Sequence, residues 1–314
     1  MIKAEVAFEK RAGLLQVLKR IKRDIWVYAL LVPGLVYYIV FKYLPMWGVS
    51  IAFMDYNPFL GISGSKWVGL KHFIDFFGSY QIKQLFRNTV FLATYNLCLS
   101  FPAPILLALM LNEVFNEKFK KIVQTMIYLP HFISWVVVVG LCHVIFSPEN
   151  GIVNMFLTRM GMNKVYWLTS ESAFRLFYTA QGIWKGVGWG TIVYLAALAA
   201  IDVEMCEASY IDGANRFQRI WYITLPSIRP TIIILLILKV GDFLDTGFEH
   251  IYLMTNSLNR EVAQVFDTYV YEKGLLNGSY SYSTAVGLFK SIFGLILVFI
   301  ADRLAKRAGN DGIY

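Results

Sequence analysis

The chain has 314 residues, of which 57% are hydrophobic and only 16% are charged, and its mean hydropathy is +0.53. Soluble domains carry about 25% charged residues, so this composition excludes an ordinary soluble enzyme or binding domain. The net charge of +8 does not indicate nucleic-acid binding, because the basic residues lie mainly at the ends of apolar runs, where they act as topology signals. The three cysteines fit neither a zinc site nor a disulfide framework.

The apolar runs predict an all-α integral membrane protein. Residues 1–25 alternate apolar and basic positions at helical spacing, which is typical of an amphipathic helix on an anionic membrane surface. A helix needs about 20 mostly apolar residues to cross a bilayer. Six segments meet this requirement, at 26–52, 88–111, 122–146, 176–200, 230–250 and 284–303.

The distribution of Lys and Arg predicts the orientation of this six-helix bundle. With six spans, both termini lie on the same side as the second-to-third and fourth-to-fifth loops, and that side holds more than half of the 29 Lys and Arg residues. Basic loops face the cytoplasm, so we expect both termini to be cytoplasmic. The opposite loops, at about 53–87, 147–175 and 251–283, are long and rich in aromatic residues, which suits the membrane interface or a docked outside partner.

Charged residues inside the spans are candidates for a transport pathway. A charge at the bilayer centre costs about 2.5–3.5 kcal/mol, so such a side chain faces protein or water. Lys185 lies in the fourth span and Lys290 in the sixth, while the fifth contains Lys239, Asp242 and Asp245. Lys239 and Asp242 are spaced to form an ion pair on one helix face, and a contact with cargo is the alternative.

The fourth span also combines small and aromatic residues. Gly182, Gly186 and Gly190 recur every fourth residue, which favours close helix packing, and Trp184 and Trp189 flank them. A pathway lined by aromatic faces and polar groups suits carbohydrate. We therefore predict the following cargo-facing residues: Trp184, Trp189, Asp242 and Asp245.

The segment between the fourth and fifth spans carries the most specific pattern. It reads Glu207-Ala208-Ser209-Tyr210-Ile211-Asp212-Gly213, and Ile223-Thr224-Leu225-Pro226 follows. Small residues allow close approach of another protein, and Gly213 permits a sharp turn. The segment resembles the EAA loop of binding-protein-dependent ABC importers, in which Glu-Ala-Ala is followed by Gly six residues after the Glu and then by Ile-x-Leu-Pro. Ser209 replaces the second Ala.

The resemblance implies a type I ABC importer permease with a coupling loop at 201–229. In that family the loop seats a short helix on a separate ATPase subunit. The residues expected to contact the ATPase are Glu207, Ala208, Ser209, Asp212, Gly213 and Ala214. The chain has no phosphate-binding loop of its own, so we expect it to bind no cofactor and to leave ATP and Mg²⁺ to the ATPase. It is a transport subunit rather than an enzyme.

By the same resemblance, the full importer contains a second homologous permease, two ATPases and an extracytoplasmic binding protein that delivers an oligosaccharide in the bacterial inner membrane. The chain divides into the N-terminal segment at 1–25, the first span and outer loop at 26–87, a permease core at 88–305 and a cytoplasmic tail at 306–314. Several stretches resemble permeases of complex-polysaccharide importers, including those for alginate and rhamnogalacturonan: Leu31-Val32-Pro33-Gly34, Phe41-Lys42-Tyr43-Leu44-Pro45, Asp55-Tyr56-Asn57-Pro58-Phe59, Trp67-Val68-Gly69-Leu70 and Asp267-Thr268-Tyr269-Val270-Tyr271.

Three alternatives remain open at this level. An ion-coupled secondary transporter would use Lys185, Asp242 and Asp245 as a relay, but it predicts inverted repeats, which the sequence does not display. A structural or sensory membrane subunit would tolerate changes at Gly213. An ABC permease for a non-sugar solute would keep the coupling loop and change only the cargo.

Overall fold

The computed structural model describes residues 23–309 and 312, so the amphipathic segment predicted at 1–25 falls almost entirely outside the described residues. Helices dominate, and a short antiparallel strand pair joins β1 (Met54–Asp55) to β2 (Lys66–Trp67). Four helical stretches are long and apolar enough to cross a membrane, and two bent helix pairs bring the number to as many as six. The all-α membrane fold is thereby confirmed, with up to the six predicted spans.

The first two spans each contain a π turn just ahead of a proline. The π turns η1 and η3 precede Pro45 and Pro102, because a proline lacks the N–H and crowds the preceding turn of an α-helix. The elements are α2 (Ile25–Tyr38), η1 (Ile39–Tyr43), α3 (Leu44–Met46), η2 (Trp47–Phe53), α4 (Gly61–Gly64), α5 (Lys71–Gly78), α6 (Gln81–Tyr95), η3 (Asn96–Ser100) and α7 (Pro102–Asn112). No side chain of α2 is buried, so its apolar surface is left for lipid or another protein.

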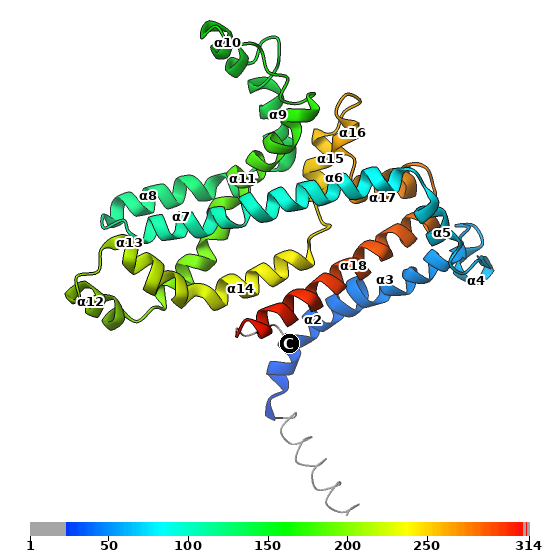
Figure 1. The fold of residues 1–314 in the computed structure, drawn as a ribbon. Helices are drawn as coiled ribbons and strands as arrows, with labels where there is room; N and C mark the ends of the chain where they lie inside the picture. The colour runs from blue at the N-terminus through cyan, green and yellow to red at the C-terminus, as the bar shows by residue number, and fades with distance from the viewer. Residues whose placement is uncertain (1–22, 310–311, 313–314) are drawn as a thin grey trace, which may run out of the picture.

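The predicted third span at 122–146 is not one continuous helix. It consists of α8 (Glu117–Tyr128) with the 3₁₀ turn η4 (Leu129–Phe132), followed after a bend of 99° by α9 (Trp135–Ile145). Pro130 ends the regular helix, and Ser134 starts the next one by accepting a hydrogen bond from the Val137 amide at 3.4 Å. The predicted continuous helix was therefore wrong at this point. In Figure 1, α9 and α10 (Ile152–Arg159) extend away from the rest of the bundle.

The fourth span matches the prediction closely, and the fifth does not. The fourth is α11 (Glu171–Ala199), and a bend of 74° separates it from α12 (Val203–Ile211). The fifth was predicted at 230–250, but the helical stretch runs from Arg216 to Gly241 as α13 (Arg216–Arg219), η5 (Ile220–Thr224) and α14 (Leu225–Gly241). Past Gly241 the chain does not resume the helix at once: Asp245 accepts the Gly247 amide at 3.0 Å and Gly247 has φ +77°, which is a turn geometry.

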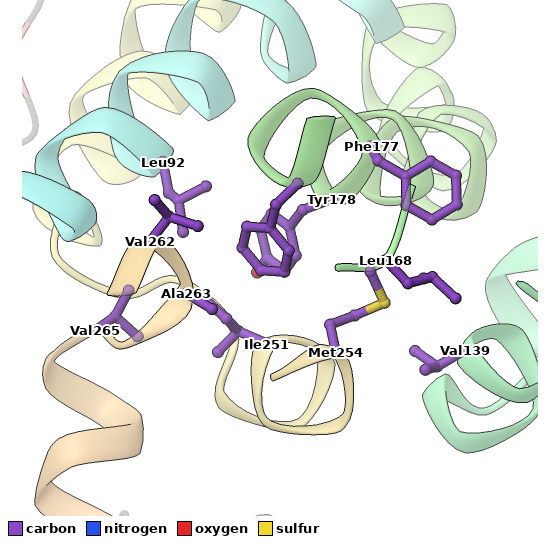
Figure 2. Close-up of a cluster of buried hydrophobic side chains, with 11 residues drawn as sticks. Leu92, Val139, Leu168, Phe177, Tyr178, Ile251, Met254, Val262, Ala263 and Val265 are labelled. Atoms are coloured by element: carbon purple, nitrogen blue, oxygen red, sulfur yellow. The ribbon is translucent and has the colours of Figure 1, made fainter. Parts of the chain in front are cut away.

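The last part of the chain forms several short helices and the sixth span. These are α15 (Phe248–Met254), α16 (Arg260–Ala263), α17 (Phe266–Tyr271), η6 (Glu272–Leu276) and α18 (Tyr280–Arg307). In the ribbon view, α12 lies at one end of the bundle, and α5 and α17 lie at the other (Figure 1). A buried apolar cluster joins α6, α9, α11, α15 and α16, with Tyr178, Ile251 and Met254 at its centre (Figure 2).

Candidate functional site

The helix α12 carries the predicted coupling residues and has well-formed ends. At its start, the Asp202 carboxylate accepts the Glu204 amide at 2.9 Å. At its end, Gly213 has φ +79°, its amide donates to the Tyr210 carbonyl at 3.1 Å, and the Ala214 amide donates to the Ser209 carbonyl at 3.0 Å. Such a termination needs a left-handed residue. The predicted turn at Gly213 is therefore confirmed.

The surface of α12 is exposed and partly apolar. Glu207, Ala208, Asp212 and Gly213 are exposed, Ala214 is half-buried, and Ser209 is buried with its hydroxyl donating to the Cys206 carbonyl at 2.7 Å. Two large side chains of α12 outside the predicted contact set, Tyr210 and Ile211, are 72% and 84% exposed, and Phe217 of the following α13 is 82% exposed. Grouped exposed apolar residues mark interaction surfaces, so α12 can dock on a partner.

One cation–aromatic contact joins α12 to α13, and a second joins α13 to the loop before α8. The Arg219 guanidinium lies 5.6 Å from the centre of the Tyr210 ring, and that of Arg216 lies 5.1 Å from the Phe115 ring. Asn215 and Gln218 form a reciprocal cap at the start of α13, with bonds of 2.9 and 2.8 Å. The helix therefore projects from a defined base.

A second feature is a polar pocket of about 380 Å³ between α11, α14 and α15. Its lining residues are Asn96, Ser100, Trp135, Tyr178, Thr179, Gly182, Lys239, Asp242, Asp245, Thr246, Gly247 and His250. The predicted cargo-facing set is thus divided. Asp242 and Asp245 line this pocket, whereas Trp184 and Trp189, each about half-exposed, do not.

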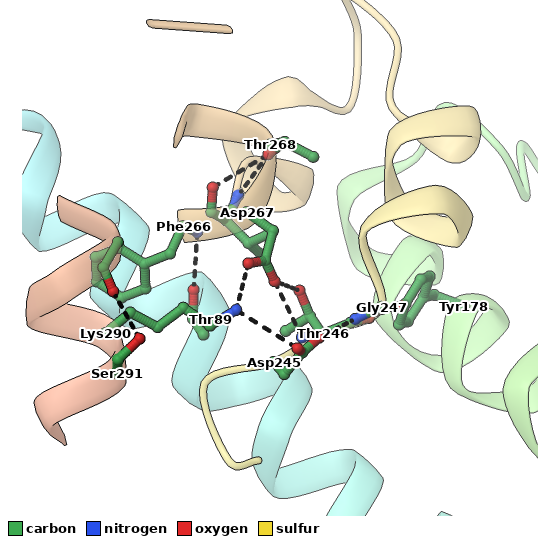
Figure 3. Close-up of polar contacts among 12 residues, drawn as sticks. Thr89, Tyr178, Asp245, Thr246, Gly247, Phe266, Asp267, Thr268, Lys290 and Ser291 are labelled. Atoms are coloured by element: carbon green, nitrogen blue, oxygen red, sulfur yellow. Dashed lines mark hydrogen bonds and ion pairs between the residues drawn. The ribbon is translucent and has the colours of Figure 1, made fainter. Parts of the chain in front are cut away.

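The ion pairs differ from the predicted one. Lys239 and Asp242 form no ion pair, although both lie in the described part of the chain. Lys290 of the sixth span pairs instead with Asp267 and lies 3.7 Å from the Asp245 carboxylate. Asp267 also accepts the Thr246 amide at 3.3 Å, so the 242–247 loop is tied to α17 and α18 (Figure 3). Of the two alternatives for Lys239 and Asp242, the ion pair does not form, and α14 ends between the two residues.

A buried histidine in the pocket wall was not identified from the sequence. His250 is 3% exposed, and its ring is stacked between Trp135 at 3.7 Å and Tyr178 at 4.1 Å between ring centres. Its Nε2 lies 2.7 Å from the Gln181 side-chain oxygen. Burial, together with the charge of Lys185, lowers the pKa of His250 from its ordinary 6.5 to about 3, so the ring stays neutral. The Tyr178 hydroxyl donates to the Thr246 carbonyl.

The predicted glycine stripe on α11 is only partly a packing surface. A Cβ on Gly190 would meet the Pro104 ring at 2.9 Å, and one on Gly188 would lie 2.0 Å from the Ile127 carbonyl oxygen. Gly182 and Gly186 have no such neighbours within 4 Å, and Gly182 lines the polar pocket. Close packing therefore occurs at the Gly190 end of the stripe, and the Gly182 end opens on the pocket.

Comparison with known proteins identifies the family. The pattern that defines the binding-protein-dependent transport system inner membrane components matches residues 100–310. Protein LplB of Bacillus subtilis is 53% identical over 94% of this chain and 92% of its own length. The polygalacturonan/rhamnogalacturonan transport system permease protein YteP of the same organism is 53% identical over 98% of this chain and 94% of its own.

A solved structure agrees with this result. A chain of the bacterial alginate ABC transporter, in complex with a periplasmic protein bound to an alginate pentasaccharide, matches with a TM-score of 0.86 and 41% identity. The match covers 94% of this chain and 99% of that one. Proteins of this kind are transport components rather than enzymes. The chain belongs to the family of binding-protein-dependent transport system inner membrane components, and it is a multi-pass permease of the ABC importer type.

Proposed function

We propose that the chain is the permease subunit of an ATP-driven importer that moves an oligosaccharide into the cytoplasm by alternating access. The observation that carries this proposal is α12, a capped helix that displays exposed Glu207, Tyr210 and Ile211 at one end of the bundle. A second permease, two ATPases that bind ATP and Mg²⁺, and an extracytoplasmic binding protein complete the importer. ATP binding closes the ATPase pair, moves α12 and turns the pathway outward, and hydrolysis resets it.

We infer that α12 and both termini face the cytoplasm. The excess of Lys and Arg on their side of the predicted topology supports this orientation. A membrane-impermeant thiol reagent applied to intact cells tests it with the Tyr210→Cys variant, because Tyr210 is exposed on α12. Labelling only after the membrane is opened is the expected result, and labelling of intact cells would reverse the orientation.

The coupling role is tested by co-purification and by ATPase activity in lipid, comparing the wild type with Glu207→Ala and Gly213→Asp. We expect both variants to lose the ATPase subunit or its stimulation. Glu117→Ala is the matched control, because Glu117 is also an exposed helical carboxylate on the predicted cytoplasmic side. If no ATPase co-purifies and neither variant changes transport, the coupling role of α12 is refuted.

The polar pocket supports a carbohydrate cargo. Sugar rings present CH groups to aromatic faces and hydroxyls to polar side chains, and the pocket offers Trp135 and Tyr178 beside Asn96 and Asp242. Relatives named for polygalacturonan, rhamnogalacturonan and alginate transport favour acidic oligosaccharides. Lys239, which lines the pocket and forms no ion pair with a described residue, would pair with a uronate carboxylate.

The cargo proposal is tested by transport of matched acidic and neutral oligosaccharides into vesicles that contain the complete importer. Lys239→Met is expected to reduce transport of the acidic sugar more than that of the neutral one, and Asp242→Asn to affect both. Equal effects of Lys239→Met on the two sugars would refute carboxylate recognition by Lys239. Transport of an amino acid or an inorganic ion in place of every sugar would identify a permease for a non-sugar solute.

A further inference from the structure

The break in the third span exposes backbone groups inside the membrane region. The 3₁₀ turn η4 ends at Phe132, α9 starts at Trp135, and the two helices diverge by 99°. The last carbonyls of a helix have no partner within that helix. In hydrocarbon each unsatisfied backbone group costs several kcal/mol, so a broken span needs an outside donor.

Lys185 of α11 supplies that donor. Its ammonium donates to the His131 carbonyl at 2.6 Å and to the Ile133 carbonyl; the Pro130 carbonyl, at 3.4 Å, also accepts the Ile133 amide at 3.2 Å. An ammonium has three N–H groups and accepts nothing, so these carbonyls use all of its donors. Lys185 does not line the polar pocket, which argues against a role as cargo ligand or proton relay.

Gly188 and Trp189 lie on the same face of α11 as Lys185, and both contact the chain just before the break. At Gly188 the backbones of α11 and α8 touch, since an added Cβ would lie 2.0 Å from the Ile127 carbonyl oxygen. Trp189 is stacked on His131, with ring centres 4.4 Å apart and planes within 4°. Residues at positions i, i+3 and i+4 share one side of a helix, so one helix face contacts the end of α8, the break and His131 together.

The first residue after the break connects this arrangement to the pocket. The Trp135 ring centre lies 5.3 Å from the Lys185 ammonium, its ring is stacked on His250, and Trp135 is part of the pocket wall. We propose that Lys185 is a positioning residue: by capping the broken third span it fixes Trp135 in the wall of the transport pocket. The cap itself follows from the contacts alone, while the effect on cargo rests on the proposed function.

Amide hydrogen exchange of the complete importer in lipid nanodiscs tests the cap directly. Lys185→Met removes the charge at similar length, and we expect amides between 129 and 138 to exchange at least about tenfold faster than in the wild type, because hydrogen bonds to a charged donor are lost. Lys185→Arg keeps a charged multiple donor and should restore part of the protection. Lys164→Met is the control, because Lys164 is exposed and outside the break.

The cap would be overturned if amide exchange were unchanged in Lys185→Met. It would also be overturned if Lys185→Met and Lys185→Arg lost the same amount of amide protection. The second measurement is the amount of oligosaccharide transported per ATP hydrolysed. With Trp135 no longer fixed, Lys185→Met should transport at least a few-fold less sugar per ATP, while loaded binding protein still stimulates hydrolysis. If transport and ATP hydrolysis fell in proportion, Lys185 would have only a structural role. If the wild type transports no sugar, the proposed function fails, and the exchange experiment still decides whether Lys185 caps the break.

Discussion

Because α11 and α8 are in contact at Gly188, the addition of a single methyl group there by Gly188→Ala should destabilise the protein. A Cβ at this position would lie 2.0 Å from the Ile127 carbonyl oxygen and 2.5 Å from its carbon, both of which are backbone atoms. Carbon and oxygen in contact stay about 3.3 Å apart, so Gly188→Ala forces the helices apart by roughly 1.3 Å. Overpacking of this kind costs about 1–3 kcal/mol.

Gly186→Ala is the matched control, because a Cβ there meets nothing within 4 Å and the residue lies one half-turn away on the same helix. Both substitutions gain up to about 1 kcal/mol of helix propensity, so the difference between the variants isolates the steric cost. Thermal unfolding midpoints in nanodiscs, measured at one scan rate, should be several degrees lower for Gly188→Ala than for Gly186→Ala. Equal midpoints would refute the close contact of the two backbones.

Three further predictions follow from individual contacts. Gly213 has φ +79°, so Gly213→Val should cost about 1–2 kcal/mol and reduce ATPase co-purification more than Gly213→Asn, which tolerates this geometry. His250 is held neutral, with a pKa of about 3 in the folded protein. Below pH 6.5 the unfolded chain therefore binds a proton that the folded chain does not. Between pH 6.5 and 5 the free energy of unfolding should fall by about 2 kcal/mol, which lowers the unfolding midpoint. The His250→Gln variant should lack this fall. Lys290→Met leaves the carboxylate of Asp267 unpaired and should destabilise the protein by about 2–4 kcal/mol, with Lys290→Met/Asp267→Asn recovering part of the loss in the same unfolding assay.

Local signals were sufficient for α12 and for most of the spans. The end of α12 depends on one residue with positive φ, and a glycine at position 213 indicates such a helix end in the sequence. The break in the third span also has local signals, Pro130 and Ser134, but the surrounding apolar run masks them when hydropathy is averaged over a whole span. The fifth span was misplaced for a similar reason, because apolar residues continue past the turn at Gly247 into α15.

The polar pocket could be predicted only in part. Asp242 and Asp245 were found because a charge inside an apolar run is conspicuous. Trp184 and Trp189 are five residues apart, or about 140° around a helix, so their separation on α11 follows from helix geometry and could have been foreseen. The stack at His250 could not be foreseen, because its three rings come from α9, α11 and α15, which only tertiary structure brings together.

The position of α12 in the chain links the proposed docking surface to the pocket. α11 ends at Ala199, with three residues between it and the start of α12, and it contributes Tyr178, Thr179 and Gly182 to the pocket. After α12, the stretch from Arg216 to Gly241 leads to Asp242. From Gly182 to Ala199 the helix spans roughly 26 Å at about 1.5 Å per residue. A displacement of α12 therefore acts at the ends of two rigid helices, each of which forms part of the pocket wall.

Loosening one of these connections should separate ATP hydrolysis from transport. Insertion of two glycines after Ala200 leaves the Asp202 cap and the surface of α12 intact, but it makes the connection to α11 flexible. We expect the ATPase to co-purify at the wild-type level and ATP to be hydrolysed, while oligosaccharide transport per ATP falls at least about tenfold. The same insertion after Gly161, an exposed turn residue with φ +75°, is the control and should leave this ratio unchanged. Wild-type transport by the Ala200 insertion would mean that motion reaches the pocket through α14 alone, and loss of the ATPase itself would mean that the short connection shapes the docking surface rather than transmitting its movement.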